Sequence, residues 1–145
     1  MSNWREINKE VILKLKPCED RLENYLKHYN DFNGDLSEFL DLEQISETDK
    51  ISLAVRVMPR FLVEVFAIDC AVSALKYGDA DSAAYAADSA DSAADDAAAY
   101  AAAHAAYAAA HAARAAFYAA PYAHAAREKE RQSQIEALHI IIEGE

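Results

Sequence analysis

The fold is decided by residues 97–126, AAAYAAAHAAYAAAHAARAAFYAAPYAHAA, the centre of an alanine-rich block that runs from Ala80 to Ala126. The block has 47 residues, of which 28 are alanine, and no Leu, Ile, Val or Met occurs between Lys76 and Gln134. Alanine is the best helix former because its side chain loses no entropy in a helix. Its methyl group buries little area, so alanine helices pack only where their backbones approach closely. The block therefore predicts helices that touch through alanine faces.

An eleven-residue repeat runs through this block. One register of the repeat holds Tyr85, Asp96, Tyr107 and Tyr118, and another holds Ser89, Tyr100, His111 and Tyr122. The larger residues together recur about every 3.67 positions, which is close to the period of an unstrained helix. The repeat predicts a nearly straight stripe of Tyr, His and Asp side chains on a surface that is otherwise alanine.

The length of the block predicts that it does not form one straight helix inside a compact domain. Forty-seven helical residues extend about 70 Å, whereas a compact domain of this size has a radius of gyration near ~15 Å. We expect at least one break, either in the Asp88–Asp96 segment or around Pro121, giving an alanine-lined helical hairpin. Long rods joined in a dimer are the alternative.

The residues before the block have the texture of amphipathic helices. One apolar helix face is predicted by residues that recur at helical spacing, namely Trp4, Ile7, Val11, Ile12 and Leu15. A second apolar face is formed by Cys18, Leu22, Tyr25, Leu26 and Tyr29. Pro17 fits the first turn of that second helix. Asn33 and Gly34 predict a turn, a short helix follows from Ser37, and Ser46 to Asp49 predicts the next helix start. Pro59 either kinks this helix or opens another.

The segment from Phe61 to Tyr77 is apolar on nearly all sides, which predicts the buried centre of a bundle. Asp69 within it lies either at the bundle edge or among buried hydrogen-bonding groups. After the charged run REKER, residues 135–142 predict a last amphipathic helix that returns to the core. We predict one all-α domain, a helical bundle with N-terminal helices (1–78), an alanine-rich hairpin or rod (79–126) and a C-terminal helix (127–145).

The charge balance limits the classes of partner. The formal net charge is -11, which argues against direct binding to nucleic acid or to an anionic membrane, since both favour Lys and Arg. An acidic surface attracts basic protein surfaces instead. Cys18 and Cys70 both lie in apolar helical patterns, which predicts buried, reduced thiols. No signal peptide or membrane-spanning stretch is visible, so we expect a cytoplasmic protein.

Two features are candidates for partner binding. The aspartates between residues 79 and 96 form either an acidic patch that docks a basic surface or a solvated helix end whose charges suit the helix dipole. The tyrosine-histidine stripe is either a binding face or a row of knobs that fill gaps between alanine helices. The predicted partner-binding residues are Asp88, Asp91, Asp95, Asp96, Tyr100, His104, Tyr107, His111 and Tyr118.

The sequence offers little for catalysis or for a cofactor. His104 and His111 are seven residues apart, roughly 10 Å along a helix, which is too far for one metal ion without other ligands. Three scattered glycines provide no phosphate-binding loop, and no G-x-S-x-G motif occurs. We therefore expect no enzyme activity, no cofactor and no metal. Ice binding also suits eleven-residue alanine repeats, but the repeat positions here hold Tyr, His and Asp where such faces hold threonine.

Several stretches resemble the alanine-rich, Imm-5-like immunity protein group of bacteria and their phages. They are LKPCEDRLENYL (Leu15–Leu26), VFAIDCAVSAL (Val65–Leu75), the alanine repeats from Ala83 to Ala126, and the closing REKERQSQIEALHIII. The chain departs from the group at Ile51–Arg60, where members carry a tryptophan-rich motif. The resemblance implies an all-helical fold and a neutralising partner role, and it supplies no catalytic residues.

These observations predict a non-catalytic acidic protein that binds and neutralises a protein partner, either a toxin or a host defence or nucleic-acid enzyme. The alternative is a structural homo-oligomer, such as a homodimer, that assembles through its alanine-rich helices and has no inhibitory target. The two hypotheses differ in whether the alanine faces or the stripe of larger side chains meets the other molecule.

Overall fold

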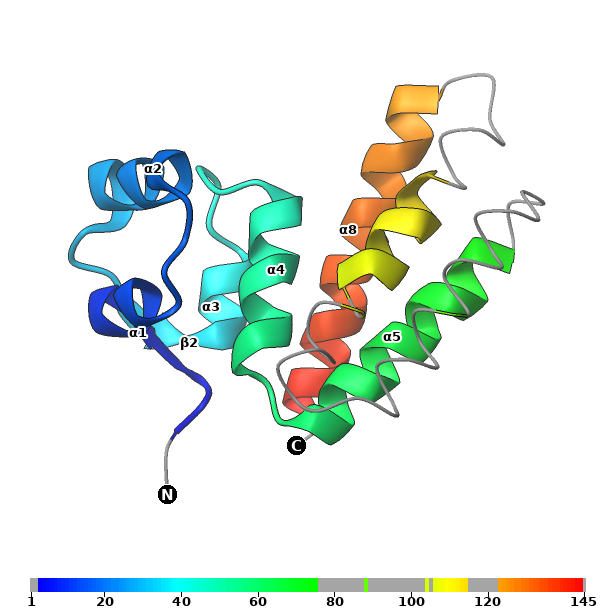
Figure 1. The fold of residues 1–145 in the computed structure, drawn as a ribbon, viewed down its shortest axis with the longest axis horizontal. Helices are drawn as coiled ribbons and strands as arrows, with labels where there is room; N and C mark the ends of the chain where they lie inside the picture. The colour runs from blue at the N-terminus through cyan, green and yellow to red at the C-terminus, as the bar shows by residue number, and fades with distance from the viewer. Residues whose placement is uncertain (1–2, 76–87, 89–103, 105, 115–122, 145) are drawn as a thin grey trace.

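A computed structural model describes residues 3–75, 88, 104, 106–114 and 123–144. The described part is mostly helical, as predicted, with one small two-stranded sheet. Figure 1 shows the N-terminal elements on one side of the molecule and α5 (Arg60–Leu75) on the other. Between them lie α4 (Glu47–Val57), residues 106–114 and α8 (Ala123–Glu143).

The sheet replaces two features that the sequence predicts as a helix and a turn. β1 (Glu6–Asn8) pairs antiparallel with β2 (Asn33–Asp35), and Ile7 lies opposite Gly34. The prediction of helix at Ile7 and the prediction of a turn at Asn33-Gly34 are both wrong. The pairing brings together residues about 27 positions apart in the chain, so local spacing carries no signal for it. Ile7 is fully buried, which anchors the short sheet in the core.

Side-chain caps set the starts of several N-terminal helices. The Asn8 side chain accepts a hydrogen bond from the Val11 amide at 3.0 Å and begins α1 (Lys9–Lys14). The Asp35 carboxylate accepts from the Ser37 amide at 3.0 Å and begins α3 (Leu36–Leu40). Ser46 caps α4 by accepting from Asp49, so the predicted start at Ser46 is confirmed. Each cap satisfies a helix amide that has no partner within its own helix.

The two cysteines have different environments. Cys70 on α5 is buried, as predicted, but Cys18 is exposed. Cys18 is the N-cap residue of α2 (Glu19–Tyr29), with extended backbone, so it lies before the helical face to which the sequence pattern assigns it. Both thiols are free, and no disulfide joins them.

α5 is buried on one side only, which corrects the prediction of a helix that is covered all round. Its start follows Pro59, whose carbonyl accepts from the Leu62 amide at 3.0 Å, so this proline opens a helix. One side of α5 carries Leu62, Val63, Phe66, Ala67 and Cys70 into the core. The other side is exposed, because α5 packs against α8 on its inner face.

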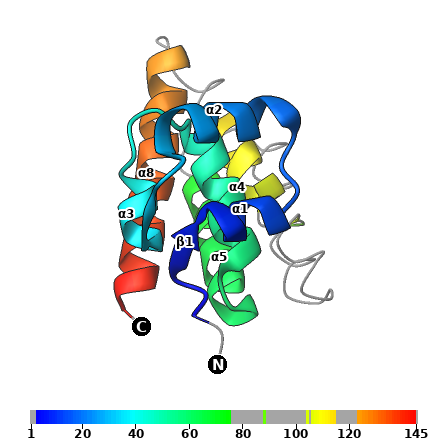
Figure 2. The ribbon, with the colours of Figure 1, turned by 90° about the vertical axis from the view of Figure 1, so that its left-hand side faces the viewer.

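α8 is the helix that closes the core. It packs against α3, α4 and α5, and its Leu138 and Ile142 are fully buried, in agreement with the predicted returning helix. The Arg5 guanidinium donates to the Ile142 carbonyl oxygen at 2.6 Å. This bond places β1 beside the C-terminal end of α8, as Figure 2 shows from the side. The predicted break at Pro121 lies outside the described residues, as does the Asp88–Asp96 segment apart from Asp88.

Candidate functional site

The helix at residues 106–114 turns its alanines inward and its larger side chains outward. Its buried alanines are Ala108, Ala109, Ala112 and Ala113, which share one helical face. Tyr107 is 58% exposed, and Arg114 is also exposed. Tyr107 therefore does not fill a gap between alanine helices.

Three of the predicted binding residues and one base gather on this outer side. We use the name Tyr107 face for His104, Tyr107, His111 and Arg114. The His104 and Tyr107 rings lie with centroids 6.3 Å apart, tilted by 57°. His104 and His111 are half-buried. Burial, and then the charge of Arg114, lower the pKa of His111, which keeps this imidazole neutral near pH 7.

A chain of polar contacts fixes the helix that carries the Tyr107 face. The Gln134 amide nitrogen on α8 donates to the Ala109 carbonyl oxygen at 3.0 Å and to the Glu130 carboxylate at 2.7 Å. The Ser73 hydroxyl on α5 donates to the other Glu130 oxygen at 2.6 Å. These bonds link residue 109 to α8 and α8 to α5. Residues 106–114 thus lie beside α8 and do not continue it as one straight rod (Figure 1).

Sequence reasoning missed this polar network. Glu130 lies in the charged run REKER, which reads as solvated surface, yet Glu130 and Gln134 are both buried. A buried carboxylate is costly unless hydrogen bonds satisfy it, and Glu130 accepts two. The available signal was the four-residue spacing of Glu130 and Gln134, which puts both on one helix face. Their burial follows from the neighbouring helices and is not visible in that spacing.

A cavity of about 220 Å³ lies next to the network, between α5 and α8. Cys70 lines it, and burial together with the charges of Glu130 and Asp69 raises the pKa of the Cys70 thiol. This thiol stays protonated near neutral pH and is a poor nucleophile. Asp69 also lines the cavity and is exposed, which places it at the edge of the bundle.

An apolar stripe runs along the outer side of α5. Phe61, Val65, Ile68 and Val72 are each 44–55% exposed. They are separated by four, three and four residues, which puts them on one helix face. We call these four residues the α5 stripe. Sequence reasoning assigned all of them to a buried helix and so missed the stripe as a surface.

The predicted site is described only in part. The structure places His104, Tyr107 and His111 on one face, and Asp88 is exposed. The remaining predicted binding residues, Asp91, Asp95, Asp96, Tyr100 and Tyr118, lie outside the described residues. The acidic patch as a unit therefore stays a prediction.

Among the described residues, no group of three or more His, Cys, Asp or Glu side chains is placed to hold a metal ion. None of the described helices combines the length and apolar character needed to cross a bilayer. No protein-family model, curated protein or solved structure matches the chain. The resemblance to immunity proteins stays a prediction.

Proposed function

We propose that the protein acts without catalysis, by binding and neutralising another protein that carries a basic surface. The partner would be a toxin, or a host defence or nucleic-acid enzyme. The observation that supports this most is the exposed Tyr107 on a helix whose other side is fixed in the core. A tyrosine held in this way offers a large contact area at small entropic cost, which is typical of residues that dominate binding energy.

Charge supports a basic partner. The chain has a formal net charge of -11. Complementary charges on two partners speed their association, and like charges disfavour binding. The proposed site joins the Tyr107 face to the aspartates at 88, 91, 95 and 96 and to Tyr100 and Tyr118. It includes an alanine-lined helical hairpin that would present these residues together. The contact between Gln134 and the Ala109 carbonyl favours such a fold over a rod.

Capture of the partner at two salt concentrations tests the proposal. The tagged full chain serves as bait in a lysate of the producing cell, with mass spectrometry as the readout. We expect one stoichiometric partner that is lost as salt rises, because exposed charges are screened beyond about 10 Å at 0.1 M salt. Replacing Tyr107 by alanine should weaken binding about tenfold, the loss typical of an interface aromatic.

Two further variants make that experiment specific. Leu13→Ala removes an apolar side chain of similar exposure from α1, on the opposite side of the molecule, and should bind like wild type (Figure 1). Asp88→Asn should weaken binding mainly at low salt. Equal recovery by wild type and Tyr107→Ala would remove the Tyr107 face from the site. Recovery of the bait alone would contradict the neutralising function.

A second function is self-assembly, and the α5 stripe favours it. Four exposed apolar side chains in a row suit an interface between copies of the chain. Sedimentation velocity over a wide range of protein concentration tests this. If the chain self-associates, the fraction of dimer and therefore the mean sedimentation coefficient rise with protein concentration. Ile68→Glu should abolish the rise of the sedimentation coefficient with concentration, because the substitution would bury a charge in the interface. Ile140→Glu, at an exposed position on α8, is the matched control.

A further inference from the structure

The N-terminal elements contain a buried hydroxyl group that has no hydrogen-bond partner among the described residues. Tyr25 on α2 is only 3% exposed, and no described group bonds to its phenolic oxygen. Burial raises the pKa of this phenol, so it remains a protonated donor at neutral pH. Buried polar groups in native proteins nearly always have a partner, so this hydroxyl is available to donate to a ligand.

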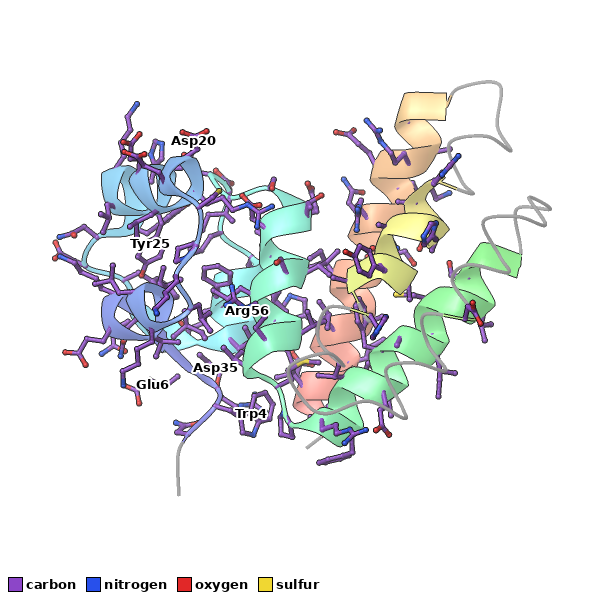
Figure 3. The ribbon with its side chains drawn as sticks, viewed as in Figure 1. Trp4, Glu6, Asp20, Tyr25, Asp35 and Arg56 are labelled. Atoms are coloured by element: carbon purple, nitrogen blue, oxygen red, sulfur yellow. The ribbon has the colours of Figure 1, made fainter. Side chains whose placement is uncertain are left out.

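Tyr25 lines a cavity of about 60 Å³ between α1, α2 and α4. In Figure 3 Tyr25 lies between α2 and α1, and Arg56 lies on the side of α4 that faces them. Part of the wall is apolar and includes Ile12, Phe39 and Leu53. A single water molecule requires about 15 Å³, so the cavity has room for a group of several non-hydrogen atoms.

The charged groups at the cavity are unlike the rest of the chain. Arg21, Asp49 and Arg56 line it and sum to one positive charge, in a protein whose formal charge is -11. Arg21 is paired with Asp49 at 2.7 Å. Arg56 donates through one nitrogen to the Leu15 carbonyl oxygen, which leaves other donors of its guanidinium for a second acceptor.

The loop beside the cavity is held in an uncommon conformation. Lys16 has a φ of 50°, in the left-handed region that residues other than glycine seldom adopt. Pro17, the next residue, lines the cavity, and the bond from Arg56 to Leu15 restrains the residue before Lys16. Lys16 directly follows the C-cap residue of α1, where helices commonly end in this conformation, so the turn fixes the end of a helix that borders the cavity.

We propose that this cavity binds a carboxylate group on a short aliphatic stem, with Tyr25 and Arg56 donating hydrogen bonds to its oxygens. A carboxylate on a stem of one or two carbons is a group of about this size. Its single negative charge balances the single positive charge of the lining. The apolar wall contacts the stem. The ligand is either a free small carboxylic acid or an acidic side chain of another protein, and this site is independent of the proposed function.

Titration of the full chain with sodium propionate, followed by amide NMR shifts at constant ionic strength, tests the proposal. We expect saturable shifts in residues around the cavity. Propionamide, which has the same shape and no charge, should give none. Tyr25→Phe should weaken propionate binding about tenfold, since it removes one hydrogen bond to a charged group, and Arg56→Gln should weaken it at least as much.

The Tyr25→Phe variant is expected to fold normally, because the hydroxyl it removes bonds to no group in the described part of the chain. The matched control is Tyr29→Phe, one turn further along α2. The Tyr29 hydroxyl accepts from the Gln44 amide at 3.2 Å, outside the cavity lining, so this variant should bind propionate like wild type.

A second titration separates the two sources of the carboxylate. A capped tripeptide with a central glutamate is compared with propionate, and a glutamine tripeptide is its control. Tighter binding of the glutamate peptide supports an acidic side chain of another protein, and tighter binding of propionate supports a free acid. Failure of both to saturate, or equal binding by wild type and Tyr25→Phe, would overturn the proposal and leave a cavity that holds water alone.

Discussion

The N-terminal elements and the helix at residues 106–114 are both packed into the core, but different forces hold them. In the N-terminal elements, large side chains such as Tyr25, Leu36 and Phe39 are buried. Burial of each such side chain contributes roughly 1.5–3 kcal/mol. Side-chain caps at Asn8 and Asp35 then define where the helices begin.

In the alanine-rich helix, the buried side chains among the described residues 106–114 are all small. Its buried residues Ala108, Ala109, Ala112 and Ala113 carry single methyl groups, whose burial stabilises by about 0.8 kcal/mol per carbon. The small side chains leave the Ala109 carbonyl oxygen accessible to the Gln134 amide, which donates to it at 3.0 Å. The N-terminal elements are therefore stabilised by the large volume of their buried side chains. The helix at residues 106–114 requires small side chains at its buried positions. Truncation of a buried side chain should destabilise the N-terminal elements, and enlargement of a buried side chain should destabilise the helix at residues 106–114.

The largest expected effect comes from truncation in the first region. Phe39→Ala on α3 should lower the free energy of unfolding by about 3–5 kcal/mol, because it leaves a cavity in the core. Denaturant unfolding measures the change. Phe61→Ala, which removes the same side chain from an exposed position, should cost within about 0.5 kcal/mol. Similar losses for both phenylalanines would show that side-chain volume does not distinguish the buried region.

Enlargement should damage the second region. Ala112→Leu places three extra carbons in a closely packed contact and should cost about 1–3 kcal/mol. Ala110→Leu makes the same change on the exposed side of that helix and should leave stability nearly unchanged. Denaturant unfolding, with hydrogen exchange of amides 106–114, measures both variants. A stable Ala112→Leu protein with unchanged exchange would contradict close backbone packing.

The smallest expected effect concerns an ion pair that joins β2 to the residue before β1. The Arg5 Nε and Asp35 Oδ1 atoms lie 3.0 Å apart, and the hydrogen bond from Arg5 lowers the pKa of Asp35 to about 2. Because the folded-state pKa is below the unfolded value, this stabilisation is present above about pH 4 and is lost as pH falls towards 2. Asp35→Asn keeps a helix cap and should cost about 1 kcal/mol at pH 7.

The pH dependence separates the ion pair from other effects of that substitution. The difference in unfolding free energy between wild type and Asp35→Asn should shrink as pH falls from 4 to 2. Asp20→Asn, at an exposed position in the first turn of α2, is the control and should differ little from wild type. A difference that stays constant across this pH range would assign the effect to packing.

The sequence predicted those parts of the fold that local chemistry controls. The helix start at Ser46 and the C-terminal helix were predictable, since each depends on residues within a few positions. Pro59 allowed either a kink or a new helix, and the structure shows a new helix. The predicted burial of Cys70 is confirmed, although the neighbours that cover it are distant in the chain. The β1–β2 pairing was not, because Ile7 and Gly34 meet only in the folded chain. The exposure of Cys18 was missed because an N-cap residue lies outside the helical periodicity that surrounds it.

The candidate site was predictable to a similar extent. The repeat puts His104, Tyr107 and His111 in one row, and the structure keeps them on one face. The repeat could not tell whether this row or the alanine row faces the core. Nor could it reveal that Glu130 is buried, because a charged residue among REKER has the same local pattern whether or not a neighbouring helix covers it.

The sequence by itself determined the helical character of this protein, its acidic charge and the regular stripe of large side chains on alanine, since these follow from residue type and spacing. Only the tertiary structure decided which face of each helix is covered, which carboxylate is buried and where a tyrosine hydroxyl meets a cavity. Burial depends on neighbours that are distant in the chain. The Tyr107 face, the α5 stripe and the Tyr25 cavity all result from that second kind of information.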